Sequence, residues 1–289
     1  MQRLIIFFII VLTFLFCNCD ICNIDSVESE YECIDPIDCI EWSEIPDGSY
    51  IGGVDNISST IDYDYQIMVN EVTNEQYIYF LNQAYADSLI TVLYDMVRGY
   101  YKGDELYPER PDYFYTITNE FETQFPLSFH DGFFSIDSSL LNHPVDYLSW
   151  YGATAFADFY GFQLPSSGEW EKAARGNTGY RFPWGDNKNL NLANIWDSGD
   201  PFDNGTTPVG FYNGENNLGY ATGNDSSPYG LHDLIGNVTE WTRSFDNETN
   251  HYIFKGMSWG ANWYPDCWMD FSSNSHGNIG LGKGFRCVR

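Results

Sequence analysis

The stretch LPSSGEWEKAARG, residues 164–176, carries the clearest folding signal in the chain. Ser166 is followed three residues later by Glu169, which is the spacing of a capping box at a helix N-terminus. Glu171 and Arg175 then stand one helical turn apart with the acid first, the favourable order for an ion pair. The stretch therefore predicts a short helix that ends at its closing glycine.

Two further helices are predicted upstream. Thr73 and Gln76 have the same capping spacing, and Ser149 precedes another run of helical period that Gly161 is placed to end. The first of these helices presents one apolar face, made by Tyr77, Phe80, Leu81 and Ala84.

The rest of the chain favours short strands and loops. Residues 48–53 indicate a strand running into a glycine turn, and residues 62–69 alternate weakly like a strand. We interpret residues 87–140 as an insertion of aromatic hairpins and loops, and after about residue 180 no helix-length apolar period remains. Few helices among many short pieces indicate a loop-rich fold with few long elements.

Composition excludes several classes of function. The 289 residues contain 41 Asp and Glu against 13 Lys and Arg, a formal charge of −28. A surface this negative repels phosphates, which excludes nucleic acid as a partner and disfavours anionic membranes. With 43% hydrophobic and 18% aromatic residues, the chain can bury a sizeable core, which excludes general disorder.

The N-terminus predicts export. Residues 1–19 contain one basic residue and then an apolar run of signal-peptide length. Cys17 directly follows that run, so a lipoprotein signal with a membrane tether is one reading, and an uncleaved apolar tail is the alternative. Residues 20–41 form an acidic tether and residues 42–289 the folded domain. We expect a periplasmic, outer-surface or extracellular protein, in which Cys33 and Cys39 can close a small disulfide loop.

Several sequence blocks occur together in a fixed order over the folded part. They are EVTN (71–74), HPV (143–145), SWYGA (149–153), LPSSGEWEKAARG (164–176), FPWGD (182–186), TPVG (207–210), SPYGL (227–231), GNVTEW (236–241), KGMSW (255–259) and GFR (284–286). With these blocks the chain resembles the formylglycine-generating enzyme family, also called the sulfatase-modifying factors. The resemblance implies a single α+β domain with a C-type-lectin-like core.

The resemblance also implies a reactive site, and here the sequence departs from the family. The family's enzymes use copper and oxygen to oxidise a cysteine of a sulfatase to formylglycine, and two nearby thiolates hold the soft copper(I) ion. The first of those positions falls on Ala261, whereas the second falls near Cys267. Ser258 keeps the family's serine, but Thr239 replaces a tryptophan. Ser258 and Cys267 are the candidate catalytic residues, and bound copper is not expected.

Two calcium sites are implied by the same resemblance, because calcium prefers carboxylate, amide and carbonyl oxygens. The first corresponds to Asp233, Gly236, Val238 and Glu240, with a carboxylate at Asp233 in place of the family's amide. The second corresponds to Asn194, Ile195, Asp200 and Phe202, with Asp203 as a rival ligand. Taken without the resemblance, such Asp, Asn and Gly loops are usually turns.

Cys287 stands where the family has a disulfide cysteine, but the usual partner positions fall on Ala157 and Ala174. Those bridges are therefore absent, and a Cys267–Cys287 bridge is left open by the sequence.

Two functions remain in view. One is an exported, calcium-stabilised family member in which the oxidase activity is in doubt. The other is a non-catalytic module on the same fold that binds a protein or peptide segment or a small ligand, with C-terminal aromatic residues such as Trp259, Trp263 and Trp268 as its surface.

Overall fold

The computed structural model describes residues 35–105, 107–118, 127–202, 204–262, 271–272 and 280–289. It contains three α-helices, two short 3₁₀ helices and fifteen strands within these residues. The helices are α1 (Asn74–Ala86), α2 (Trp150–Tyr160) and α3 (Ser167–Arg175), with η1 (Ser138–Leu140) and η2 (Leu190–Leu192). No helix of the described part is long and apolar enough to cross a membrane.

All three α-helices begin where their sequences predict, and α2 and α3 also end at the predicted glycines. Thr73 and Ser166 each form a capping box with the residue three positions on, and Ser149 accepts a hydrogen bond from the N–H of Gly152. Gly161 ends α2 with a φ of 73°, the left-handed conformation in which glycine has no steric penalty. These helix ends are fixed locally, without help from distant residues.

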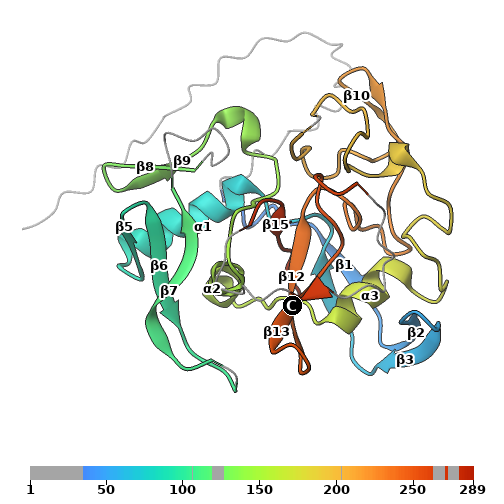
Figure 1. Cartoon of the computed structure of the whole chain (residues 1–289), viewed down its shortest axis with the longest axis horizontal. Helices are drawn as coiled ribbons and strands as arrows, with labels where there is room; N and C mark the ends of the chain where they lie inside the picture. The colour runs from blue at the N-terminus through green and yellow to red at the C-terminus, as the bar shows by residue number, and fades with distance from the viewer. Residues whose placement is uncertain (1–34, 106, 119–126, 203, 263–270, 273–279) are drawn as a thin grey trace, which may run out of the picture. The chain divides into compact units, whose positions relative to one another are not determined.

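The strands form several small sheets (Figure 1). The largest has the order β14-β13-β12-β15, in which β15 runs parallel to β12 and the other pairs are antiparallel. The strand bounds are β1 (Trp42–Ile45), β2 (Gly48–Gly52), β3 (Ile57–Ile61), β4 (Tyr65–Met68), β5 (Ile90–Leu93), β6 (Met96–Tyr101), β7 (Arg110–Ile117), β8 (Ser128–His130), β9 (Phe133–Ser135), β10 (Asn216–Asn217), β11 (Tyr220–Ala221), β12 (Thr239–Asp246), β13 (His251–Lys255), β14 (Phe271–Ser272) and β15 (Lys283–Gly284).

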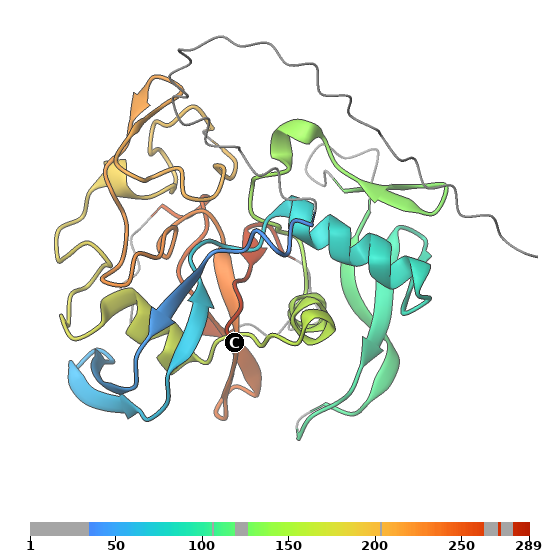
Figure 2. The same ribbon diagram turned by 180° about the vertical axis from the view of Figure 1, so that it is seen from behind.

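The four-stranded sheet lies in the middle of residues 35–289. The α1 helix and the β5–β6–β7 sheet lie on one side of it, and α3 with the β2–β3 hairpin lies on the other, as the opposite views agree (Figures 1 and 2). Residues 87–140 form the three strands β5 to β7, the β8–β9 hairpin and η1. The aromatic residues of this segment therefore build real strands that pack beside α1 and α2.

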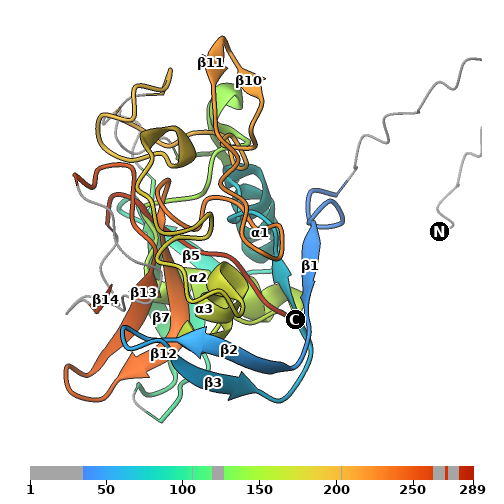
Figure 3. The ribbon, with the colours of Figure 1, turned by 90° about the vertical axis from the view of Figure 1, so that its right-hand side faces the viewer.

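The two ends of the folded part pair with each other. Val288 forms one antiparallel β-bridge with Ile67 of β4 and another with Gln163, which lies between α2 and α3. Figure 3 shows the C-terminus beside the β1 and β4 region. This pairing joins the C-terminal end of the folded part to its N-terminal strands.

Two apolar clusters form the core. The larger one packs α1 and α2 against the central sheet and includes Phe80, Phe156, Trp241 and Phe285. The smaller one surrounds Trp170 of α3. The predicted apolar face of α1 is confirmed, because Tyr77, Phe80, Leu81 and Ala84 are all buried.

Candidate functional site

Ser258 lies just beyond β13 and packs against Gly282. A Cβ atom placed on Gly282 would come within 2.4 Å of the Cβ atom of Ser258, and the φ of Gly282 is +70°. Both facts require glycine at this position. The carbonyl of Gly282 accepts hydrogen bonds at 2.8 Å from the backbone N–H and from the hydroxyl of Thr239. Thr239, which replaces the family's tryptophan, therefore fixes the segment on which Ser258 rests.

A carboxyl group lies beside the same glycine. The N–H of Gly282 donates to Oδ2 of Asp146 at 3.3 Å. Burial raises the pKa of Asp146 to about 7. Lys283, the next residue along β15, places its ammonium 4.9 Å from the ring centre of Trp241 and 5.2 Å from that of Phe254. Burial lowers the pKa of Lys283.

No pair of thiols is found at this place among the described residues. Ala261 holds a turn, since its N–H donates to the carbonyl of Ser258 and its carbonyl accepts from the N–H of Trp196, both at 3.0 Å. Cys267 lies outside the described residues, as do Trp263 and Trp268. Cys287 is free and fully buried, so the Cys267–Cys287 bridge that the sequence left open does not form.

Cys39 is disulfide-bonded. Cys33, its predicted partner, lies outside the described residues.

Glu240, the predicted carboxylate ligand of the first calcium site, is held by two other side chains. Arg286 donates to both of its oxygens, at 2.7 and 2.8 Å, and the indole N–H of Trp170 donates to one of them at 2.8 Å. Both members of the Glu240–Arg286 pair have 0% side-chain exposure. The charge of Glu240 is therefore already balanced by a guanidinium.

Asp233 lies in a different electrostatic setting. It is 2% exposed, and its Oδ2 accepts the N–H of Gly210 at 2.6 Å. Burial, with the nearby charge of Asp225, raises the pKa of Asp233 to about 7. Burial and the charges of Asp233 and Glu240 likewise raise the pKa of Glu71 well above its usual value.

Asp225 adds a fourth buried acid to this cluster. Its Oδ1 lies 2.5 Å from Nδ1 of His232, and its Oδ2 accepts the N–H of Asp233 at 2.8 Å. Hydrogen bonding to Asp225 raises the pKa of His232, whereas burial raises that of Asp225. Glu71, Asp225, Asp233 and Glu240 together thus place more negative than positive charge around Arg286.

The donor set at Asp233 fits a hard cation in part. Oδ1 of Asn70 is buried without a hydrogen-bond partner in the described part of the chain. A Cβ on Gly210 would lie 3.2 Å from that oxygen, so Asn70 and Asp233 approach the same glycine. No group of three or more His, Cys, Asp or Glu residues arranged to hold a metal is found among the described residues. Asp233 and Asn70 offer oxygen atoms of the kind that calcium prefers, whereas Glu240 is already paired with Arg286.

The second predicted calcium set satisfies its polar groups internally. The carboxylate of Asp200 accepts hydrogen bonds from Ser198, Tyr212 and the N–H of Phe202 at 2.7 to 2.8 Å. The amide nitrogen of Asn194 donates to the carbonyl of Gly205 and to Asn237. The carbonyl of Ile195 accepts the N–H of Ser198. The polar groups of this loop thus bond to neighbouring residues, Asp203 lies outside the described residues, and the second calcium site stays a prediction.

The sequence analysis did not assign Glu71, Asp225, His232, Asp146 or Arg286 to a site. Glu71 belongs to the EVTN block and Arg286 to the GFR block. Membership of these blocks is the sequence feature that could have pointed to both residues. Asp225 and His232 lie seven residues apart in an irregular loop, where no sequence period brings them together.

Comparisons with known proteins agree with this fold. A family model for the sulfatase-modifying factor enzyme 1-like domain matches residues 44–289. Mouse formylglycine-generating enzyme is 39% identical over 120 residues, covering 37% of this chain and 29% of that protein. The bovine protein named inactive C-alpha-formylglycine-generating enzyme 2 is 34% identical over 129 residues, covering 41% and 39%. The matched part thus spans well under half of these relatives.

Solved structures support the fold alone. PvdO from Pseudomonas aeruginosa has a TM-score of 0.55 at 17% identity, covering 89% of this chain and 95% of that one. CarF has a TM-score of 0.54 at 19% identity, covering 86% and 98%. From the family match over residues 44–289, the chain belongs to the formylglycine-generating enzyme, or sulfatase-modifying factor, family.

Proposed function

We propose that this protein is an exported family member that lacks the copper-dependent oxidase activity and acts as a calcium-stabilised binding module. The proposal rests on Ala261, which stands where the family resemblance places the first copper thiolate. A two-coordinate copper(I) site needs two soft sulfur ligands. Among the described residues, Cys287 cannot replace the missing first thiolate, because it is buried in the core, and Cys39 is disulfide-bonded. The described residues therefore do not fit a two-thiolate copper site.

Export is supported by the bonded state of Cys39. Disulfides form and persist in oxidising compartments and are rare in the cytosol. The proposed location is periplasmic, outer-surface or extracellular, with an N-terminal lipid as the tether in the lipoprotein case.

Calcium binding is proposed at Asp233, with the carbonyls of Gly236 and Val238 as further ligands. Support comes from the excess of buried acids around Asp233 and from the partnerless Oδ1 of Asn70. A bound divalent cation would supply positive charge where burial otherwise favours protonation of the carboxyl group. The proposed partner of the module is a protein or peptide segment or a small ligand.

The copper part is tested by restoring the missing thiol. Wild-type protein, Ala261→Cys and the matched control Ala261→Ser are titrated with copper(I) against a competing chelator, and each is incubated with a CxPxR peptide. We expect high-affinity copper(I) binding only in Ala261→Cys, because only that variant has cysteines at both positions that the family resemblance implies. Stoichiometric copper(I) binding by the wild type, or its conversion of the peptide to an aldehyde, would refute the proposal.

A further inference from the structure

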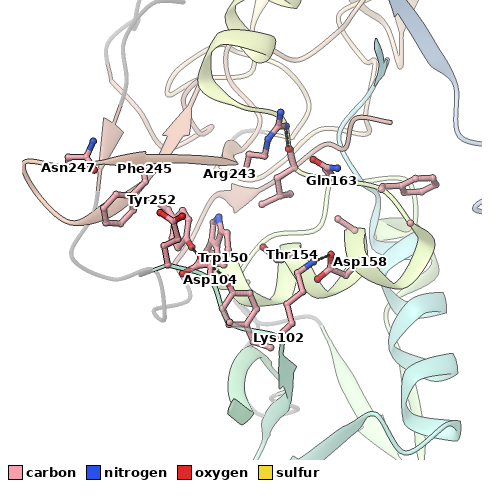
Figure 4. A pocket seen from close by; sticks show the side chains of 17 residues that line it. Lys102, Asp104, Trp150, Thr154, Asp158, Gln163, Arg243, Phe245, Asn247 and Tyr252 are labelled. Carbon is pink, nitrogen blue, oxygen red and sulfur yellow. Dashed lines mark hydrogen bonds and ion pairs between the residues drawn. The ribbon is translucent and has the colours of Figure 1, made fainter. Parts of the chain in front are cut away.

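A cavity of about 630 Å³ opens between α2, the β12–β13 hairpin and the segment after β6 (Figure 4). This volume lies in the range of small-molecule sites. The hairpin contributes Phe245, Asn247 and Tyr252, the helix contributes Thr154 and Asp158, and Lys102 and Asp104 come from the segment after β6.

The cavity lies away from Ser258. It contacts the hairpin end of β12, whereas Thr239 and Gly282 meet at the other end of that strand. From Thr239 to Phe245 a strand extends about 20 Å. The cavity is therefore separate from the Ser258 region, and ligand binding there does not depend on the proposed loss of oxidase activity.

Negative charge predominates among the lining side chains. Asp104, Glu105 and Asp158 contribute carboxylates. Lys102 is the nearest counter-charge and bonds to Oδ1 of Asp158 at 2.8 Å. The other basic residue, Arg243, is committed elsewhere, since it pairs with Glu169 at 2.6 Å and donates to the carbonyl of Leu164. A ligand that enters here meets an excess of carboxylates.

Aromatic side chains line part of the cavity, and two tyrosines hydrogen-bond to the carboxylate of Asp104. The rings of Trp150 and Tyr252 are stacked with centroids 3.6 Å apart. The hydroxyls of Tyr101 and Tyr252 both donate to Oδ2 of Asp104. Such donors favour the ionised carboxylate. Aromatic faces beside carboxylates attract organic cations.

A second cavity, of about 400 Å³, adjoins the first across the Lys102–Asp158 pair, because both residues line both cavities. Its other walls are mostly apolar and include Phe80, Leu89 and Phe159. The dividing pair is exposed, with side-chain exposures of 61% and 40%. An exposed ion pair of this kind contributes little to stability and can rearrange.

We propose that the two cavities form one site for a small organic amine with an aliphatic arm. The ammonium group lies among the carboxylates of Asp104, Glu105 and Asp158, where it competes with Lys102 for Asp158. The arm passes the ion pair and enters the apolar cavity beside Leu89.

The test uses three probes with the same number of carbon atoms, hexylamine, hexanol and hexanoate, and methylamine as an amine without the aliphatic arm. Each is titrated into the full chain by ligand-observed NMR at low salt. The variants are Asp158→Asn, Glu105→Gln and Leu89→Ser, with Asp62→Asn as the control because Asp62 is an exposed acid outside both cavities. Thermal unfolding of each variant checks that the domain stays folded.

We expect saturable binding of hexylamine, about tenfold weaker binding of hexanol and no binding of hexanoate. Asp158→Asn and Glu105→Gln should each weaken hexylamine binding about fivefold, and Asp62→Asn should not change it. Leu89→Ser should weaken hexylamine binding but leave methylamine binding unchanged. The proposal is overturned if hexanol or hexanoate binds as tightly as hexylamine. It is also overturned if both acid variants behave like Asp62→Asn.

Discussion

Replacing Asp233 by asparagine tests the electrostatics of the buried acid cluster. Burial and the charge of Asp225 raise the pKa of Asp233 from 3.8 to about 7 in the folded protein. A group with a raised folded pKa binds its proton more tightly in the folded state. Its contribution to stability is therefore complete below pH 3.8 and is lost as the pH rises to about 7. The difference between the two pKa values corresponds to about 4 kcal/mol.

Asp233→Asn should remove this loss. The asparagine oxygen can still accept the N–H of Gly210, so the hydrogen bond at 2.6 Å need not be lost. In EDTA at pH 8, we expect the variant to be more stable than the wild type by up to about 4 kcal/mol. At pH 4 the two proteins should have nearly equal free energies of unfolding, because the carboxyl group is then protonated in the folded protein.

The assay is urea unfolding at several pH values, in EDTA and in millimolar calcium. Calcium should stabilise the wild type at pH 8 more than the variant, because the carboxylate is the charged ligand. Asp62→Asn, which changes an exposed acid outside the cluster, is the baseline. The reasoning is wrong if, in EDTA at pH 8, Asp233→Asn is no more stable than wild type. An equal response of both proteins to calcium would remove Asp233 from the proposed calcium site.

Three further predictions concern the same domain. Arg286→Gln should lower the free energy of unfolding by about 3 to 5 kcal/mol, because it leaves Glu240 charged and unpaired in the core; urea unfolding measures this, and a loss below about 1 kcal/mol would contradict the pairing. Gly236→Ala should destabilise the domain strongly, since its φ is +98° and the added Cβ would lie 2.4 Å from the carbonyl oxygen of Asn194; an unchanged melting temperature would rule out this close approach. Cys287 should react with a thiol reagent only after denaturation, because it is fully buried and burial raises the pKa of its thiol; rapid labelling of Cys287 in the native protein, identified by peptide mapping, would show that it is accessible.

Local signals in the sequence predicted the helices accurately. Thr73, Ser149 and Ser166 cap α1, α2 and α3 as their spacing indicates. The Glu171–Arg175 ion pair forms at 2.6 Å. These features depend on residues within one helical turn of each other, so tertiary packing was not needed to find them.

The site was harder to predict, because its partners are far apart in sequence. Glu240 was expected to bind calcium, but Arg286, which is 46 residues away, donates to both of its oxygens. Asn237 and Glu71 meet across 166 residues. No period or motif spacing encodes such contacts. The sequence alone therefore cannot tell whether a carboxylate such as that of Glu240 pairs with a metal ion or with an arginine.

The pairing of β4 with the last strand-like residues sets a limit on when this domain can complete its fold. Arg286 donates to the carbonyl of Met68, which lies 218 positions earlier in the chain. A ribosome must therefore synthesise nearly the whole domain before β4 can pair with the C-terminal residues. Until then the edge of β4 stays open, and the nascent chain depends on chaperones or rapid completion to avoid pairing with other chains.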